Sequence, residues 1–235
     1  GNGLIVTHGA DANLERVLSR GCWTPVERFT ASEGWQAGPQ SGDGRFAVSF
    51  GGKPQGDVHW DLFGAHNQAN ALAAIAAARH AGVPAANSIT ALAEFTGVKR
   101  RLETRGTVNG ITVYDDFAHH PTAIRATLAG LRGKAGAARI LAVLEPRSNT
   151  MKSGVMKDEL AASLAAADRV FCYGAGLGWD AAATLAPLGA KVEVHHDIVR
   201  LVAAISAAAQ PGDHVLIMSN GGFGGIHDQL LARLK

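Results

Sequence analysis

The sequence predicts an α/β fold whose C-terminal part holds a doubly wound, mostly parallel β-sheet. The first observation is a regular alternation of strand-like and helix-like segments after about residue 106, which is typical of parallel strands joined by helices. The second is the composition, because 235 residues that are 47% hydrophobic can bury the core of one large domain or two smaller ones. The third is that polar residues follow each predicted strand, at the edge where open α/β sheets bind ligands.

The first hundred residues predict a mixed set of elements. Apolar and polar residues alternate over positions 58–62, which indicates a half-buried strand. An Ala-rich helix is predicted for residues 68–81, because Gly82 and Pro84 follow it as stop signals. The other elements expected here are strands at 3–7 and 45–50, helices at 11–20 and 88–95, a loop at 34–44 and a turn at 51–54.

A change of composition at residues 97–106 predicts a domain boundary. Three consecutive cations, Lys99, Arg100 and Arg101, lie there among glycines and polar residues. We therefore expect one region at residues 1–100 and a second at residues 101–235.

The second region begins with a predicted β-hairpin. β-Branched residues flank the pair Asn109-Gly110, which favours a two-residue turn with positive φ. Strands are then predicted at 111–115, 139–144, 169–173, 191–194 and 214–218, and helices at 121–131, 155–166, 180–188, 197–208 and 226–234.

Bulk properties exclude several classes of protein. A net charge of +2 with 18% charged residues offers no basic face for nucleic acid, so no nucleic-acid partner is expected. No apolar run reaches the roughly 18 residues of a membrane span. Cys22 and Cys172 are predicted to be free thiols, which fits a reducing compartment such as the cytoplasm. The chain opens without Met on a strand-like run, so we expect a piece of a longer protein.

The stretch Y-D-D-F-A-H-H-P-T concentrates ionisable groups where the first parallel strand leads into a helix. It contains Asp115, Asp116, His119 and His120, and Pro121 suits the first helical position. Two carboxylates and two imidazoles at such a junction suit a ribose hydroxyl, an amine or a divalent metal. The plainer alternative is a capped, surface-exposed helix start.

Three further stretches suit ligand binding. Asn67 and Asn70 share one helix face, where amides can both donate to and accept from a nucleobase edge; alternatively Asn67 only caps the helix. Arg101 at the domain boundary can clamp a phosphate with its forked donors, or be a solvated linker charge. Arg147 and Lys152, in a polar stretch after the second strand of the sheet, can receive carboxylates, or belong to an ordinary loop.

Several of these segments resemble the Mur ligase family of peptidoglycan enzymes. The family motifs are matched, in order, by residues 64–70 (G-A-H-N-Q-A-N), 100–103 (R-R-L-E) and 114–122 (Y-D-D-F-A-H-H-P-T). Members that act on a murein tripeptide are resembled by residues 21–27 (G-C-W-T-P-V-E), 144–152 (L-E-P-R-S-N-T-M-K) and 218–227 (M-S-N-G-G-F-G-G-I-H). The resemblance covers essentially the whole chain but only part of the family's three-domain architecture.

The resemblance implies a specific domain organisation. Residues 1–100 are implied to be the C-terminal part of the family's α/β central ATP-binding domain, without its P-loop. Residues 101–235 are implied to be the Rossmann-like C-terminal domain that binds the incoming peptide. The UDP-sugar domain, the P-loop and the catalytic metal-binding Glu are expected on missing N-terminal domains of the parent chain.

The resemblance also implies an activity, that of an ATP-dependent amide ligase used in peptidoglycan recycling. It joins UDP-N-acetylmuramate to the murein tripeptide L-Ala-γ-D-Glu-meso-diaminopimelate through an acyl phosphate, with ATP and Mg²⁺. Since the main metal ligands are not in this sequence, no metal-binding residue is assigned, and the chain by itself is expected to be inactive.

Family roles transfer to individual positions. The implied nucleotide-binding residues are His66, Asn67 and Asn70 for adenine, Arg101 for ATP phosphate and Asp116 for ribose. The implied catalytic residues are Arg101, Asp116, His119 and His120, the two histidines facing the incoming amine. The implied substrate-binding residues are His119, His120, Arg147, Ser148, Asn149, Lys152 and Asn220. The alanine-adding ligase has an Arg-rich stretch in place of residues 147–152, a departure that fits a larger substrate.

Three alternatives remain open at this level. The parent protein can have another specificity of the family, such as that of a UDP-N-acetylmuramate–L-alanine ligase. The isolated chain can be a non-catalytic module that binds peptide or nucleotide. A metal-dependent hydrolase can be built on Asp116, His119 and His120, although further acidic ligands at suitable spacing are missing.

Overall fold

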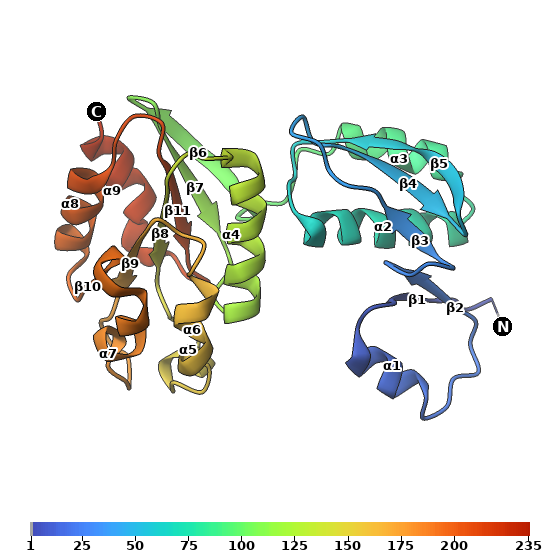
Figure 1. Cartoon of the computed structure of the whole chain (residues 1–235), viewed down its shortest axis with the longest axis horizontal. Helices are drawn as coiled ribbons and strands as arrows, with labels where there is room; N and C mark the ends of the chain where they lie inside the picture. The colour runs from blue at the N-terminus through green and yellow to red at the C-terminus, as the bar shows by residue number, and fades with distance from the viewer. Residues whose placement is uncertain (1) are drawn as a thin grey trace. The chain divides into compact units, whose positions relative to one another are not determined.

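The computed structural model of the protein describes residues 2–235. The chain forms two compact units, the first ending at Thr96 and the second beginning at Gly97. Each unit combines helices with one β-sheet (Figure 1), so the predicted α/β class is confirmed. Within the described residues, every helix is too short or too polar to cross a membrane.

The first unit is built on a five-stranded sheet in the order β1-β2-β3-β4-β5. β1, β2 and β3 run parallel, and β4 and β5 continue the sheet as antiparallel strands. Two helices, α2 and α3, pack on it through an apolar core that includes Trp35, Phe46 and Leu72. The elements are β1 (Ile5–His8), α1 (Ala12–Leu18), β2 (Val26–Phe29), β3 (Trp35–Ala37), β4 (Arg45–Phe50), β5 (Lys53–His59), α2 (Ala65–His80) and α3 (Ala85–Ala93).

Three expectations for this unit are wrong in detail. Residues 34–44, predicted as a loop, contain β3, because the fully buried Trp35 brings this short segment into the sheet. Lys53 and Pro54, predicted to lie in a turn, begin β5; a proline is tolerated there because β5 is an edge strand. The same strand ends at His59, so the strand predicted over 58–62 is cut short.

The second unit is built on a six-stranded sheet in the order β10-β9-β8-β11-β7-β6. All neighbouring strands are parallel except the antiparallel pair β6–β7, which confirms the predicted mostly parallel sheet. The elements are β6 (Glu103–Val108), β7 (Ile111–Asp116), α4 (Pro121–Ala135), β8 (Ile140–Leu144), α5 (Asn149–Lys152), α6 (Lys157–Ser163), β9 (Arg169–Tyr173), α7 (Ala181–Leu185), η1 (Ala186–Lys191), β10 (Val192–His195), α8 (Ile198–Ala208), β11 (His214–Met218), η2 (Phe223–Gly225) and α9 (Ile226–Arg233).

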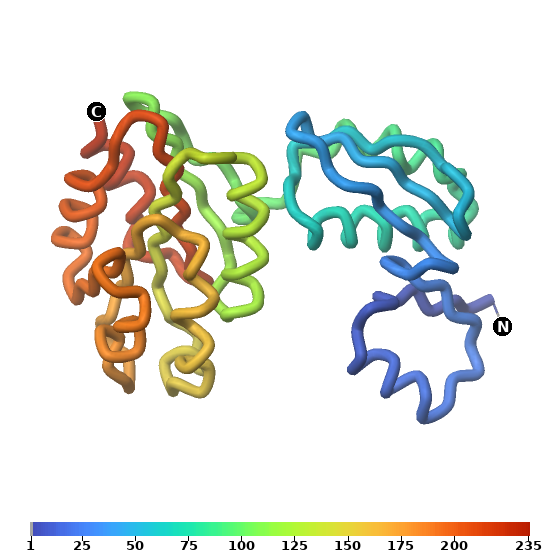
Figure 2. The backbone as a smooth tube through the Cα atoms, viewed as in Figure 1, coloured from blue at the N-terminus to red at the C-terminus, as the bar shows by residue number. Residues whose placement is uncertain are grey.

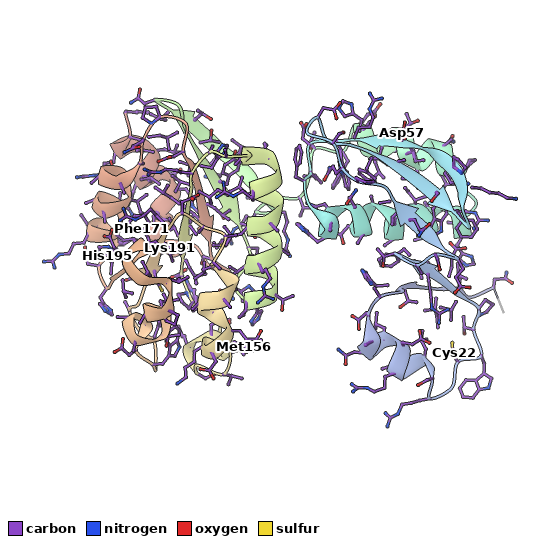
Figure 3. The ribbon with its side chains drawn as sticks, viewed as in Figure 1. Cys22, Asp57, Met156, Phe171, Lys191 and His195 are labelled. Atoms are coloured by element: carbon purple, nitrogen blue, oxygen red, sulfur yellow. The ribbon has the colours of Figure 1, made fainter. Side chains whose placement is uncertain are left out.

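Helices cover both faces of this sheet, as a doubly wound fold requires. One apolar core joins the sheet to α4, α6 and α7 and includes Leu128 and Leu160. The other joins it to α8 and α9 and includes Phe171, Ile205 and Leu230. Figure 1 shows α4 on one side of the sheet and α8 and α9 on the other, and Figure 3 labels Phe171 on β9.

The predicted hairpin between β6 and β7 is confirmed. Asn109 and Gly110 form its turn with φ of 50° and 76°, the positive values that a two-residue turn of this kind needs. The turn lies beside the C-terminal end of the chain (Figure 2). There the Asn109 amide donates a hydrogen bond to the carbonyl oxygen of Leu234 at 2.7 Å.

Candidate functional site

The loops that follow β7, β8 and β11 meet at one edge of the six-stranded sheet. Their strands are parallel neighbours, so their carboxyl ends coincide. The Glu145 N–H donates to the Met218 carbonyl at 3.0 Å, and the Ser219 N–H donates to the Asp116 carbonyl at 3.1 Å. The Ser219 hydroxyl also donates to the Glu145 carboxylate at 2.5 Å. These loops, residues 116–120, 145–152 and 219–221, are the carboxyl rim.

Asp116, the first residue of the rim, is buried, with 2% of its surface exposed. Its carboxylate accepts hydrogen bonds from the N–H groups of Leu102 and Ala118, both at 2.7 Å, and from the Thr127 hydroxyl at 3.2 Å. Burial raises the pKa of Asp116, and the N–H donors oppose that rise. A surface-exposed helix start is therefore wrong here: the carboxylate ties the segment at Leu102 to the start of α4. Its role as a ribose ligand stays a prediction.

Asp115, the neighbouring carboxylate, is surrounded by two guanidinium groups and one imidazole. It has 2% of its surface exposed and lies 3.3 Å from Arg100 Nε, 3.7 Å from Arg105 Nη1 and 3.3 Å from His227 Nε2. Burial lowers the pKa of His227, and the Asp115 carboxylate acts in the opposite direction. Since each of these groups comes from a different part of the chain, Asp115 joins β6, β7 and α9.

Arg100 connects the first residues of the second unit to the carboxyl rim. Its guanidinium donates to the carbonyl oxygens of Ser219 at 2.6 Å and Gly221 at 2.8 Å. Its own carbonyl accepts the Phe117 N–H at 2.8 Å, and its φ of 59° is unusual for a residue with a side chain. Arg100 is thus a structural tie rather than a solvated linker charge. No sequence signal separated it from Arg101, because the two carbonyls that its guanidinium binds, those of Ser219 and Gly221, lie more than a hundred positions away.

Arg101 differs from its neighbour. Its side chain is exposed, and its guanidinium carbon lies 5.6 Å from the centre of the Phe117 ring. Within residues 2–235 it forms no ion pair. A forked cation of this kind is available to an anion such as a phosphate.

His119 and His120 pack against each other, with ring centres 4.1 Å apart. His119 Nδ1 lies 2.9 Å from the Phe117 carbonyl; since a carbonyl only accepts, Nδ1 carries the proton and Nε2 of the neutral ring holds a lone pair. His120 Nδ1 is buried without a hydrogen-bond partner among the described residues. Burial lowers the pKa of His120, and the neighbouring His119 lowers it further.

The hydrolase alternative lacks a ligand set in the part of the chain that the structure describes. No group of three His, Cys, Asp or Glu side chains there is placed to hold a metal ion. The Asp116 carboxylate, which that alternative requires, is already engaged by backbone N–H groups.

The polar stretch after β8 is only partly a loop. Asn149–Lys152 form α5, a single helical turn, so the expectation of a loop is wrong over these residues. The Ser148 hydroxyl accepts the Met151 N–H at 3.3 Å and caps the turn. The other end is closed by the loop after β9, where Trp179 Nε1 donates to the Met151 carbonyl at 2.7 Å. Ser148 therefore has an internal role, and its contact with substrate stays a prediction.

Three predicted substrate-binding groups on the rim form no side-chain hydrogen bond or ion pair with the described residues. Arg147 and Lys152 are exposed and form no ion pair there. The Asn220 side-chain oxygen is buried without a hydrogen bond. Asn149 is exposed on α5 beside them. Two unpaired cations and a free amide acceptor suit a ligand that carries carboxylates together with N–H groups.

The predicted adenine-binding residues lie at the start of α2 in the first unit. Gly64, with φ of 102°, is the N-cap, and Asn67 instead donates to the Phe63 carbonyl at 2.9 Å. The alternative that Asn67 caps the helix is therefore wrong. Asn70 is exposed one turn further on, and His66 is exposed beside Asn67.

The second unit is a doubly wound α/β domain with a polar carboxyl rim, and another α/β unit precedes it. This architecture is typical of α/β proteins that bind ligands at the carboxyl ends of their strands. Residues 100–221 match the family model described as Mur ligase, glutamate ligase domain. The chain belongs to the Mur ligase family.

Within this family, the chain is similar to several named ligases. The chain is 50% identical over 234 residues, 98% of its length and 51% of the relative, to the Escherichia coli (strain K12) protein named UDP-N-acetylmuramate--L-alanyl-gamma-D-glutamyl-meso-2,6-diaminoheptandioate ligase. It is similar in structure to a murein peptide ligase from Psychrobacter arcticus 273-4, with a TM-score of 0.73 and 42% identity over 99% of this chain and 51% of that one. A UDP-N-acetylmuramate--L-alanine ligase from Mycolicibacterium vanbaalenii is 37% identical over 73% of this chain and 38% of its own length. The Escherichia coli and Psychrobacter arcticus proteins match nearly the whole of this chain, and the chain spans about half of the length of each.

Proposed function

We propose that the chain is part of an ATP-dependent ligase that joins UDP-N-acetylmuramate to L-Ala-γ-D-Glu-meso-diaminopimelate in peptidoglycan recycling. The observation that carries the proposal is the 50% identity, over 98% of this chain, to the Escherichia coli protein named for that reaction. Because ATP and UDP-sugars are cytoplasmic metabolites, we place the reaction in the cytoplasm.

Each unit takes one part of the proposed organisation. Residues 1–100 form the C-terminal part of a central ATP-binding domain, and residues 101–235 form the ligase domain that receives the peptide. Support comes from the two compact units, whose division at Thr96 and Gly97 lies close to these bounds. The missing N-terminal domains of the parent chain supply the P-loop and the UDP-sugar site.

The proposed chemistry begins with activation of a carboxylate, which is a poor acyl donor. The γ-phosphoryl group of ATP passes to the carboxylate of UDP-N-acetylmuramate and leaves an acyl phosphate and ADP. The peptide amine then attacks the acyl carbon, a C–N bond forms, phosphate departs and the amine loses a proton. Negative charge builds up on the oxygens of the tetrahedral intermediate, and fixed cations stabilise it. Arg101 is exposed and forms no ion pair with the described residues, so its guanidinium suits the transferred phosphate group.

His119 and His120 are proposed to meet the incoming amine. The Nδ1 proton of His119 is committed to the Phe117 carbonyl, which leaves Nε2 as the acceptor. A neutral imidazole with a fixed tautomer can accept a hydrogen bond from an ammonium group, or its proton. Burial lowers the pKa of His120, which favours the neutral form of the second ring.

The peptide is proposed to bind along the carboxyl rim. Arg147 and Lys152 form no ion pair with the described residues, so both cations are available to a tripeptide that carries several carboxylates. Asn149, Ser148 and the unpaired oxygen of Asn220 supply hydrogen bonds to its amides. The alternative substrate, free L-alanine, has a single carboxylate and needs fewer cations, so the rim favours the tripeptide.

Nucleotide contacts are proposed for residues of both units. Asn67 and Asn70, with His66 beside them, present amides on one face of α2 for the adenine edge. Asp116 is proposed to hold the ribose, which requires one of its buried oxygens to become accessible. The described residues form no group of three His, Cys, Asp or Glu side chains placed to hold a metal ion, so the main Mg²⁺ ligands are proposed to lie on other parts of the parent chain.

The test uses the full-length protein and follows ADP release. UDP-N-acetylmuramate and ATP are held constant while either the tripeptide or L-alanine is titrated. We expect ADP release that depends on the tripeptide, with a much lower KM than for L-alanine. The reverse preference overturns the proposed specificity, and ADP release with neither acceptor overturns the ligase proposal.

A second test concerns the 235-residue chain alone. Its sequence contains no G-x-x-x-x-G-K-[ST] motif, the loop that binds ATP phosphates in P-loop enzymes. We expect no ATP turnover by this chain, and calorimetric titration with the tripeptide then reports whether the rim binds peptide by itself. Robust ligation by these residues refutes the proposal that essential parts lie elsewhere in the parent chain.

A further inference from the structure

On the carboxyl rim, the side chain of Arg147 packs so closely against Gly221 that a side chain at position 221 would collide with it. Gly221 lies in the loop after β11. A Cβ atom added to it would lie 2.5 Å from Nη1, 2.6 Å from Cδ and 2.8 Å from Cζ of Arg147. Non-bonded carbon atoms prefer separations of about 3.5–4.0 Å. The Arg147 side chain therefore lies directly across the backbone of Gly221, in space that only glycine leaves open.

The backbone of Gly221 is fixed on both sides. Its N–H donates to the Ser219 hydroxyl at 2.9 Å, and its carbonyl accepts from Arg100 at 2.8 Å. Arg147 is exposed and has no described ion pair. If a methyl group is added at Gly221, the fixed loop stays in place and the free end of the Arg147 side chain moves.

We propose that Gly221 is a positioning residue that determines where the Arg147 guanidinium meets a carboxylate of the peptide substrate. One side of the guanidinium rests against the Gly221 backbone, so a ligand approaches it from the opposite side. The forked N–H groups bind a carboxylate well only in a narrow range of geometries. A displaced Arg147 keeps its charge but loses that geometry. The inference rests on the proposed function, because it concerns the peptide site of that reaction.

The adjacent glycine provides a matched control. A Cβ at Gly222 meets nothing within 4 Å, and Gly222 has φ of −78° and ψ of −10°, which any residue adopts. Gly221 is likewise not among the residues with positive φ. Alanine is therefore allowed by the backbone at both positions, and only Gly221→Ala meets Arg147.

The experiment measures steady-state kinetics of ligation by the full-length protein. We expect Gly221→Ala to raise the KM for the tripeptide by about tenfold to hundredfold, the range for a hydrogen bond to a charged group. The KM for ATP and the melting temperature are expected to stay close to those of the unmodified protein. Gly222→Ala is expected to match the unmodified protein in every measurement.

A double-mutant cycle separates positioning from general structural damage. In an Arg147→Ala background, Gly221→Ala is expected to cause no further rise in the KM for the tripeptide, because the group that it displaces is gone. An equal rise in both backgrounds overturns the inference, and so does a parallel rise in the KM for ATP.

Failure of the inference is distinguishable from failure of the proposed function. If the unmodified protein shows no tripeptide-dependent ADP release, the proposed function fails and the positioning role fails with it. If the unmodified protein ligates the tripeptide and Gly221→Ala behaves like Gly222→Ala, only the positioning role is overturned.

Discussion

The indole N–H of Trp179 donates a hydrogen bond to the carbonyl oxygen of Met151 at 2.7 Å. This bond closes the end of α5, while the Gly178 N–H donates to the next carbonyl, that of Lys152, at 3.1 Å. A single turn of helix is unstable by itself, because nucleation fixes several residues for one hydrogen bond. The loop after β9 therefore holds in place the turn that carries two of the predicted peptide-binding residues.

We expect Trp179→Phe to weaken this support. The substitution keeps an aromatic ring but removes the donor, so the free energy of unfolding should fall by about 1 kcal/mol. The KM for the tripeptide should rise while the KM for ATP stays constant, because α5 carries only predicted peptide contacts. Urea unfolding and ligation kinetics measure the two effects. Trp23→Phe, at a side chain that is 95% exposed, serves as the control. An unchanged KM for the tripeptide contradicts the support role.

Two adjacent arginines should respond differently to alanine. Arg100→Ala leaves Asp115 buried with fewer cations and removes the donor to two carbonyls, so we expect a loss of about 3 kcal/mol in the free energy of unfolding. Arg101→Ala removes an exposed side chain and should stay within about 0.5 kcal/mol of the unmodified protein, but it should reduce ATP-dependent turnover. Urea unfolding and ADP release distinguish the two. Equal stability of the variants contradicts the structural role of Arg100.

Two glycine substitutions should change stability in opposite directions. Gly110 has φ of 76° in the β6–β7 turn, so Gly110→Ala should lower the free energy of unfolding by about 1 kcal/mol. Gly133 lies inside α4, and a Cβ there meets nothing within 4 Å. Gly133→Ala should therefore raise the free energy of unfolding by about 0.5–1 kcal/mol. Thermal and urea unfolding test the pair, and a Gly110→Ala variant as stable as the unmodified protein refutes the assignment of the turn.

The stability of the second unit should depend on the protonation of His227. Burial lowers the pKa of His227 from its ordinary value; Asp115 and Asp228 oppose the shift, and Arg105 and Arg100 add to it. Between the unfolded value and the lowered folded value, the unfolded chain binds more protons. The free energy of unfolding therefore falls as the pH drops below about 6.5.

The measurement compares urea unfolding midpoints at about pH 7 and about pH 5. Burial lowers the pKa of His214 as well, so the unmodified protein should lose stability at the lower pH through more than one group. His227→Gln should lose less stability over the same interval. An identical loss in the variant excludes His227 as a contributor.

The second unit was easier to predict from sequence than the first. Strands such as β8 (Ile140–Leu144) are buried at every position, so they are continuous apolar runs bounded by turn signals. By contrast, β2 (Val26–Phe29) was missed, because each of its residues is half-buried and a Glu-Arg pair occupies its centre. Its neighbour β3 has three residues and depends on pairing with β4, which no local pattern indicates.

The candidate site shows the same division. The rule that ligands bind at carboxyl ends of parallel strands placed Asp116, Arg147 and Asn220 together on the rim. The rule did not identify Arg100, because its partner Ser219 lies 119 positions away in the sequence. Nor did it indicate the positioning role proposed for Gly221, because that role depends on where one long side chain lies.

The β6–β7 turn has a practical consequence for handling the protein. Asn109 binds the carbonyl of Leu234 at the amino end of β7, and the carboxyl rim begins at the other end of that strand. Six strand residues separate the two ends, a span of about 16 Å at roughly 3.3 Å per residue. An affinity tag or fluorophore appended after Lys235 therefore starts on the edge of the sheet opposite the proposed peptide site, and leaves the carboxyl rim open for binding measurements.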